Sequence, residues 1–257
     1  MRLGKLISVL VLSAVLLTAC NNGPSAAEQM YDHLEQAVTL EDTFKDQQDP
    51  LVQLEQQETE LYNEIINLGM KEFEKIEELS QEALEVVKKR QEKLEVEKES
   101  IESAKEEFDN VKPLIEDLES EEAKEKANEL VEAFNKRYDA YQELYKAYEK
   151  SNELDKELYN MFQDKELTQE KLEEQVDKIN KSYESVIEKN EAFNKLTKEY
   201  NDLKREFYEA AELNIDFDES SEQDQTNSSD DSSSEKDKSS ETNEEQSEEE
   251  DQNNDEK

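Results

Sequence analysis

Residues 172–211 read LEEQVDKINKSYESVIEKNEAFNKLTKEYNDLKREFYEAA, and this stretch decides the fold. One column of apolar residues recurs at every seventh position: Leu172, Ile179, Val186, Phe193, Tyr200 and Phe207. A second column with the same interval begins at Val176 and ends at Ala211, and it includes the polar residues Asn190 and Lys204. Spacings of three and four residues over about five heptads predict a helix with one apolar seam. In water such a seam must pack against neighbouring helices.

The segments before this stretch predict further helices. A first helix should begin at Glu28 and end before Asp49-Pro50, because proline pushes the preceding residue out of the helical region. A second helix should start after Pro50 and run to about Asn110. The apolar columns shift by one residue after Gly69, so the second helix should either bend at Gly69 or continue through it.

Pro113 should lie in the first turn of a third helix, and the weakly apolar segment Glu119–Glu129 should break or fray that helix. Short connections, near Asp49-Pro50, Lys112-Pro113 and Asp164–Thr168, make successive helices antiparallel. Only three glycines are present, which argues against sheets with tight turns and against phosphate-binding loops. The sequence therefore predicts an all-α fold, an elongated antiparallel bundle or coiled coil of three to four helices over residues 28–215.

Residues 216–257 have a different composition from the helical body. Within them, residues 218–257 hold 17 acidic residues, three lysines and no aromatic or aliphatic side chain. Because nothing there offsets the entropy of ordering, we expect a disordered acidic tail. The whole chain has a formal net charge of −40, which excludes nucleic acid as a partner because phosphate binding needs clustered Lys and Arg.

The N-terminus predicts a lipid anchor. Residues 1–19 combine Arg2 and Lys5 with a short apolar run, which is typical of a secretory signal peptide. The run ends in Leu17-Thr18-Ala19-Cys20, which resembles the lipobox of bacterial lipoproteins, with cleavage between Ala19 and Cys20. Cys20 would then carry a diacylglyceryl group with fatty acyl chains such as palmitate, and residues 20–27 would link this anchor to the body. The alternative is an ordinary secreted protein with an incidental cysteine.

Catalytic chemistry is poorly represented in the chain. His33 is the only histidine and Cys20 the only cysteine, so neither a nucleophile–histidine array nor a zinc site is expected. The acidic tail contains no glycine-kinked loop of spaced acids, so a tight calcium site is not expected either. We therefore expect a protein that is not an enzyme and that needs no metal or other cofactor.

Four tyrosines form the one candidate binding feature of the body: Tyr138, Tyr141, Tyr145 and Tyr148. Their spacings of three, four and three residues place four phenols along one helical stripe. The stripe could be a ladder on which sugar rings or a peptide stack. Alternatively, it could be a seam in which the rings pack against neighbouring helices.

The lipobox Leu17-Thr18-Ala19-Cys20 and the segment Glu28–Leu54, which leads into Gln56-Gln57-Glu58, carry a family resemblance. From about Leu3 to Phe217 the chain resembles the cell-wall-binding lipoproteins of Bacillus-like Gram-positive bacteria. The resemblance implies a location on the extracytoplasmic face of the cell membrane, near peptidoglycan, and it implies no reaction.

Two functions remain open at this point. The helical body could bind cell-wall glycan or a wall-associated protein. Removal of the signal peptide takes away Arg2 and Lys5, so the mature chain has a charge of −42 and should be repelled by anionic wall polymers. Alternatively, the protein could be an export-side chaperone or scaffold that contacts secreted polypeptides through an exposed seam. The second idea is based on a half-polar column in the second helix: Ile76, Ala83, Arg90, Glu97, Ala104 and Val111.

Overall fold

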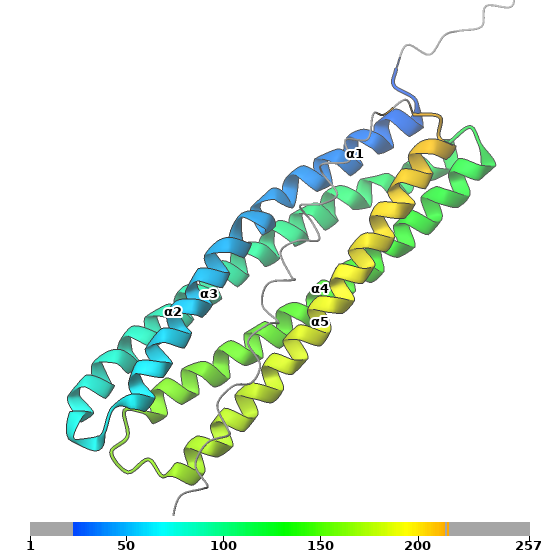
Figure 1. Cartoon of the computed structure of the whole chain (residues 1–257). Coiled ribbons are helices and arrows are strands. Elements are labelled where there is room, and N and C mark those ends of the chain that lie inside the picture. The colour runs from blue at the N-terminus through cyan, green and yellow to red at the C-terminus, as the bar shows by residue number, and fades with distance from the viewer. Residues whose placement is uncertain (1–22, 214, 216–257) are drawn as a thin grey trace, which may run out of the picture.

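The computed structural model describes residues 23–213 and residue 215. Within these residues four antiparallel helical rods form an elongated bundle without strands, as predicted (Figure 1). The helices are α1 (Ala26–Leu40), α2 (Asp42–Asn67), α3 (Phe73–Phe108), α4 (Glu121–Met161) and α5 (Gln169–Ala210). None of them is both long and apolar enough to cross a bilayer. The predicted signal peptide, Cys20 and the acidic tail, residues 216–257, lie outside the described residues.

Helices α1 and α2 together form the first rod, and the prediction that a helix ends before Pro50 is wrong. Pro50 lies inside α2, and the interruption occurs at Glu41. There the hydroxyl of Ser100, on α3, donates to the carbonyl of Leu40 (2.6 Å) and accepts from the amide of Phe44 (3.1 Å). It thus takes the place of the hydrogen bond between Phe44 and Leu40, and insertion of this kind interrupts a helix.

The chain reverses direction at Gly69, so the predicted second helix from Pro50 to Asn110 is two helices. Helix α2 ends at Asn67, and Leu68 and Gly69 adopt extended backbone before the short 3₁₀ helix η1 (Met70–Glu72) and α3. The amide of Glu72 donates to the carbonyl of Gly69 (2.8 Å). The shift in the apolar columns therefore marks the change from one rod to the next.

The third rod begins later than predicted. The segment with Pro113 continues α3 as the 3₁₀ stretch η2 (Asp109–Asp117), which packs on α1. Helix α4 starts after Ser120, whose side chain accepts a hydrogen bond from the amide of Ala123 (3.3 Å). The break expected somewhere in Glu119–Glu129 therefore falls at the start of that segment.

Both ends of the described chain lie at one end of the bundle, which we call the proximal end (Figure 1). The distal end carries the turns between α2 and α3 and between α4 and α5. Helix α5 alone has 42 residues, which corresponds to about 63 Å.

Three apolar clusters follow one another along the interior of the rod. The proximal cluster includes Met30, Leu34, Phe108, Phe134 and Phe207. The middle cluster includes Leu51, Leu94, Ile101, Tyr141 and Phe193, and the distal cluster includes Ile65, Leu79, Val87, Tyr159 and Phe162. Buried polar side chains are also present in the interior, Arg90, Arg137 and Asp155 among them.

Candidate functional site

The tyrosine stripe lies on α4 and faces the interior more than the solvent. Tyr141 and Tyr145 are buried, whereas Tyr138 and Tyr148 are half-buried. The ring of Tyr141 meets that of Phe44 edge to face, with 5.8 Å between the centroids. Burial raises the pKa of Tyr141 and of Tyr148 well above the usual value for a phenol. The stripe thus packs against neighbouring rods and offers no open ladder at Tyr141 and Tyr145.

The half-polar column of α3 is covered as well. Arg90 and Glu97 expose only 1% and 4% of their surfaces, respectively. The exposed seam expected for a chaperone or scaffold is therefore not formed by this column. Sequence analysis detected these polar residues at seam positions, but their partners come from other helices.

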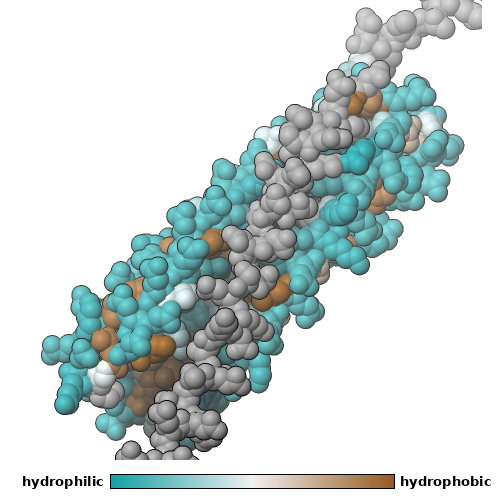
Figure 2. Space-filling model, viewed as in Figure 1, coloured by the Kyte–Doolittle hydropathy of each residue, from teal (hydrophilic) through white to brown (hydrophobic). Residues whose placement is uncertain are grey.

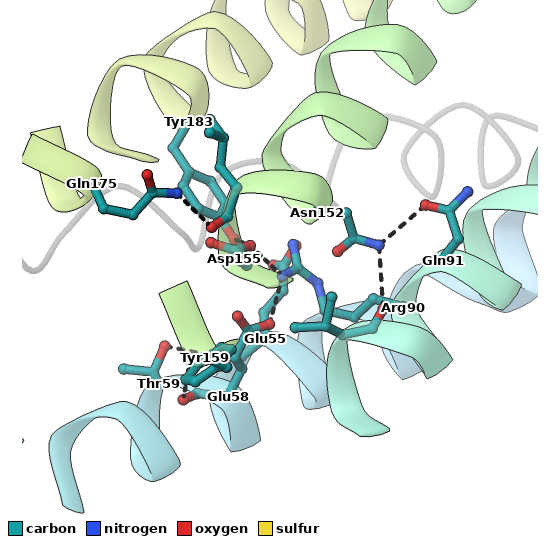
Figure 3. Close-up of polar contacts among 12 residues, drawn as sticks. Glu55, Glu58, Thr59, Arg90, Gln91, Asn152, Asp155, Tyr159, Gln175 and Tyr183 are labelled. Atoms are coloured by element: carbon teal, nitrogen blue, oxygen red, sulfur yellow. Dashed lines mark hydrogen bonds and ion pairs between the residues drawn. The ribbon is translucent and has the colours of Figure 1, made fainter. Parts of the chain in front are cut away.

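Arg90 is the centre of a buried network that joins all four rods (Figure 3). Its Nη1 donates to Glu58 on α2 (2.6 Å) and to Asp155 on α4 (3.0 Å). Its Nη2 lies 3.4 Å from Glu55. The hydroxyl of Tyr183 on α5 donates to Asp155 (2.8 Å). One cation thus faces three carboxylates in the interior of the bundle.

Burial strongly affects the acids in this region. It raises the pKa of Glu58 to about 7 against the opposing effect of Arg90, and it also raises the pKa of Asp155. Glu97, about two turns further along α3, accepts a hydrogen bond from the side-chain amide of Gln48 (2.5 Å). Its burial raises its pKa to about 8. Glu58 and Glu97, in the middle of the rod, therefore change protonation state near neutral pH.

A second buried arginine joins the proximal and middle clusters. Arg137 on α4 forms a two-pronged ion pair with Glu41, with both N–O distances 2.6 Å, at the break between α1 and α2. Its guanidinium also lies 5.0 Å from the ring centroid of Phe193. This pair joins the first rod to α4 where the first rod is interrupted.

Side chains suited to catalysis are not assembled around His33. Its Nδ1 lies 2.6 Å from Glu107 on α3, which ties α1 to α3 near the proximal end. Among residues 23–213, no group of three or more His, Cys, Asp or Glu side chains is arranged to hold a metal ion. A groove of about 500 Å³ between α4 and α5 is lined by the lysines Lys150, Lys178 and Lys181, by Glu157, and by small or apolar residues such as Ala147 and Leu154. The first two of these lysines pair with Glu153 and Glu174.

The surface of α2 and α5 differs from the rest of this highly charged molecule. We call the following residues the uncharged strip: Val52, Thr59, Asn63 and Ile66 of α2 and Val176, Asn180, Tyr183, Ile187 and Asn190 of α5. Val52, Ile66 and Ile187 expose 45%, 48% and 59% of their surfaces. They are three of the four large hydrophobic residues that are exposed in the described chain, and the fourth is Val96 on α3. Figure 2 shows hydrophobic residues among hydrophilic ones on this side of the molecule and near its distal end.

Contacts across the bundle show that the α2 half and the α5 half of the strip lie at the same level along the long axis of the bundle. The rings of Phe44 on α2 and Phe193 on α5 are 6.0 Å apart. Further along, Arg90 contacts both Glu55 on α2 and the ring of Tyr183 on α5. Because α2 and α5 are antiparallel, residues between these contacts, Val52 and Ile187 among them, also lie at similar heights. The strip cannot be recognised in the sequence because its two halves are more than 100 residues apart.

Comparisons with known proteins identify the relatives of this chain. The profile of the YkyA family, described as "Putative cell-wall binding lipoprotein", matches residues 25–210. The "Uncharacterized lipoprotein YkyA" of Bacillus subtilis (strain 168) is 37% identical over 198 residues, which cover 77% of this chain and 88% of that protein. A crystal structure of a conserved protein of unknown function from Staphylococcus aureus matches with a TM-score of 0.52 and 15% identity. That match covers 72% of this chain and 96% of the other, and it shows a similar fold alone.

Proposed function

Because this chain belongs to the YkyA family of lipoproteins, whose description includes cell-wall binding, we propose that it is a non-enzymatic surface lipoprotein that binds cell-wall glycan through the uncharged strip. The observation that carries this proposal is the exposure of Val52, Ile66 and Ile187 beside amide and hydroxyl side chains.

The chemistry of the strip suits a neutral polysaccharide. Sugar rings present apolar C–H faces, which can cover Val52 and Ile187, and hydroxyl groups, which can hydrogen-bond to Asn180 and Asn63. Anionic wall polymers are disfavoured as the ligand, because the mature chain carries a formal charge of −42. Screening limits this repulsion to about 8 Å at physiological salt, so contact with neutral glycan is compatible with the overall charge.

The proposed anchor gives the strip a suitable position. Cys20 would carry the lipid on the extracytoplasmic face of the membrane, only a few residues before α1. The proximal end would then lie beside the membrane, and the rod would extend about 60 Å from it. The strip occupies the middle and distal parts of the rod, where it would face the wall.

Retention on insoluble peptidoglycan tests the glycan proposal. The mature chain, with Cys20→Ser to keep it free of lipid, is mixed with purified peptidoglycan from which anionic polymers have been removed. The double variant Val52→Glu/Ile187→Glu should reduce the retained fraction at least about tenfold, because buried carboxylates lose hydration when the sugar packs on them. The matched control Val96→Glu adds charge at the exposed hydrophobic residue outside the strip and should bind like the parent.

Two outcomes would count against the proposal. Equal loss in the double variant and in the control would assign the effect to charge in general and remove the strip as the binding surface. Retention on crude walls that survives removal of the anionic polymers but disappears when wall proteins are removed would identify a wall-associated protein as the ligand instead of glycan.

A further inference from the structure

The Arg90 network lies directly beneath the uncharged strip. Tyr183 belongs to both, and Glu55, which bonds Arg90, lies between strip residues Val52 and Thr59 on α2. We propose that protonation of the carboxyl groups around Arg90 controls glycan binding. The protonated network holds α2 and α5 together beneath the strip. This inference rests on the proposed function and adds its regulation.

The geometry leaves the network with surplus acid. A single Nη1 of Arg90 serves Glu58 and Asp155, so these two carboxylates lie close to each other. The side chains of Glu58 and Asp155 are only 8% and 4% exposed, whereas the side chain of Glu55 is 35% exposed. One guanidinium cannot neutralise two buried carboxylates, and two like charges at such a separation disfavour each other's ionisation.

Every rod contributes titratable or charged groups to this region. They are Glu55 and Glu58 on α2, Arg90 and Glu97 on α3, Tyr148, Asp155 and Tyr159 on α4, and Tyr183 on α5. Burial raises the pKa of each of these tyrosines far above the physiological range, so the phenols stay neutral. Of the carboxyl groups, Glu58 and Glu97, whose pKa values burial raises to about 7 and about 8, therefore change charge near neutral pH.

Deprotonation acts on the contacts between rods. With a proton on Glu58 or Asp155, the net charge of the network is closer to zero. Arg90 can then hold Glu58 on α2 and Asp155 on α4 together, while the hydroxyl of Tyr183 on α5 donates to Asp155. When both carboxyl groups are ionised, Glu58 on α2 repels Asp155 on α4. Asp155 is also the hydrogen-bond partner of Tyr183 on α5. Because burial raises the pKa of Glu58 to about 7, this change begins near neutral pH. The two halves of the strip then separate as the pH rises.

The first test measures glycan retention from pH 5.5 to 9 on the same polymer-free peptidoglycan, with the mature Cys20→Ser chain as the parent. Binding by the parent should fall about tenfold across this range. The variant Glu58→Gln/Asp155→Asn, which cannot ionise at these two positions, should lose most of this pH dependence. Glu60→Gln, an exposed neighbour on α2, should keep the pH profile of the parent. A parent profile without pH dependence, or a variant with the parent profile, would overturn the inference.

Hydrogen exchange without ligand provides a second test. After correction for the intrinsic pH dependence of exchange, amides in 51–62 and 176–187 should lose protection at least about tenfold between pH 6 and pH 9 in the parent, and not in the double variant. Should the double variant lose its helical circular dichroism, Glu58→Gln alone takes its place, with a smaller loss expected. Unchanged protection in the parent refutes the control by protonation even where glycan binds. Absent binding at every pH refutes the proposed function instead, whatever the exchange shows.

Discussion

At Ser100 a single hydroxyl group satisfies both a carbonyl and an amide of another rod. The sequence shows only a serine in an otherwise regular helix, and a serine of this kind usually bonds within its own helix. Ser103 does so, since its hydroxyl donates to the carbonyl of Glu99. These two serines therefore form a natural pair for measuring what the contact between rods contributes.

Replacing Ser100 with alanine should destabilise the bundle. The carbonyl of Leu40 and the amide of Phe44 would lose their partner in a partly buried place, at a cost of about 1–3 kcal/mol. Urea unfolding measures the change, with Ser103→Ala as a control that should remain within about 0.5 kcal/mol of the parent. Equal stability of the two variants would mean that Leu40 and Phe44 bond to each other once the hydroxyl is gone.

Glu97 makes the stability of the bundle depend on pH. Its pKa, raised by burial to about 8, lies above the ordinary value of 4.5. The protonated group therefore favours folding fully below about pH 4.5, and this contribution is lost as the pH rises through 8. At pH 9 the variant Glu97→Gln should be more stable than the parent by at least about 1.4 kcal/mol, the equivalent of one pKa unit.

Urea unfolding at pH 5 and pH 9 measures this effect. The two proteins should differ little at pH 5, because the carboxyl group is then protonated in the folded state. The exposed neighbour Glu99 serves as the control, and Glu99→Gln should leave the pH dependence unchanged. A Glu97→Gln variant that is less stable than its parent at pH 9 would show that the ionised group has a favourable partner.

At the scale of elements, local rules predicted the helices well and their boundaries poorly. The heptads of α5 predicted its position, because seven-residue spacing shows up in any helix that packs along one side. Pro50 and Pro113 were wrong as boundaries, since packing between rods overrides the local preference of proline. At Gly69 the sequence left a bend and a continuous helix both open, and the full reversal found there depends on contacts between α2 and α3.

Pro50 remains a weak point in α2 that can be measured. Proline lacks the amide proton that would bond to the carbonyl of Asp46, and it costs a helix interior about 3 kcal/mol relative to alanine. Pro50→Ala should therefore stabilise the bundle by about 1–3 kcal/mol in urea unfolding. A loss of stability would show that the proline ring makes contacts that outweigh the missing hydrogen bond.

The candidate site shows where prediction from sequence stops. Arg90 and Glu97 could be recognised as polar residues in a seam, but the partners of Arg90 come from α2, α4 and α5. The tyrosine stripe was visible as a pattern, whereas the burial of Tyr141 depends on Phe44 and Phe193, in two other rods. To predict such contacts, one must know which rods are neighbours and how far each is shifted along the bundle axis. Helical periodicity in the sequence does not give this information.

For the molecule as a whole, the position of both ends predicts how it stands on a membrane. Cysteine probes replace Gly23 near the proximal end and Gly69 at the distal turn, where an added Cβ meets no atom within 4 Å. In vesicles carrying the lipidated protein, energy transfer to a headgroup acceptor should be strong from residue 23 and weak from residue 69, about 60 Å away. Equal transfer from both probes would show that the rod lies flat.

The break at Glu41 has a mechanical consequence. With the lipid at one end and a wall polymer held at the strip, tension would enter through α1 and leave through α2 and α5. The interruption between α1 and α2 would then be the weakest link along this path, and Ser100 and Arg137 reinforce it from the side. Pulling single molecules should therefore rupture the Ser100→Ala variant at lower force than the parent, and equal rupture forces would show that the load bypasses the break.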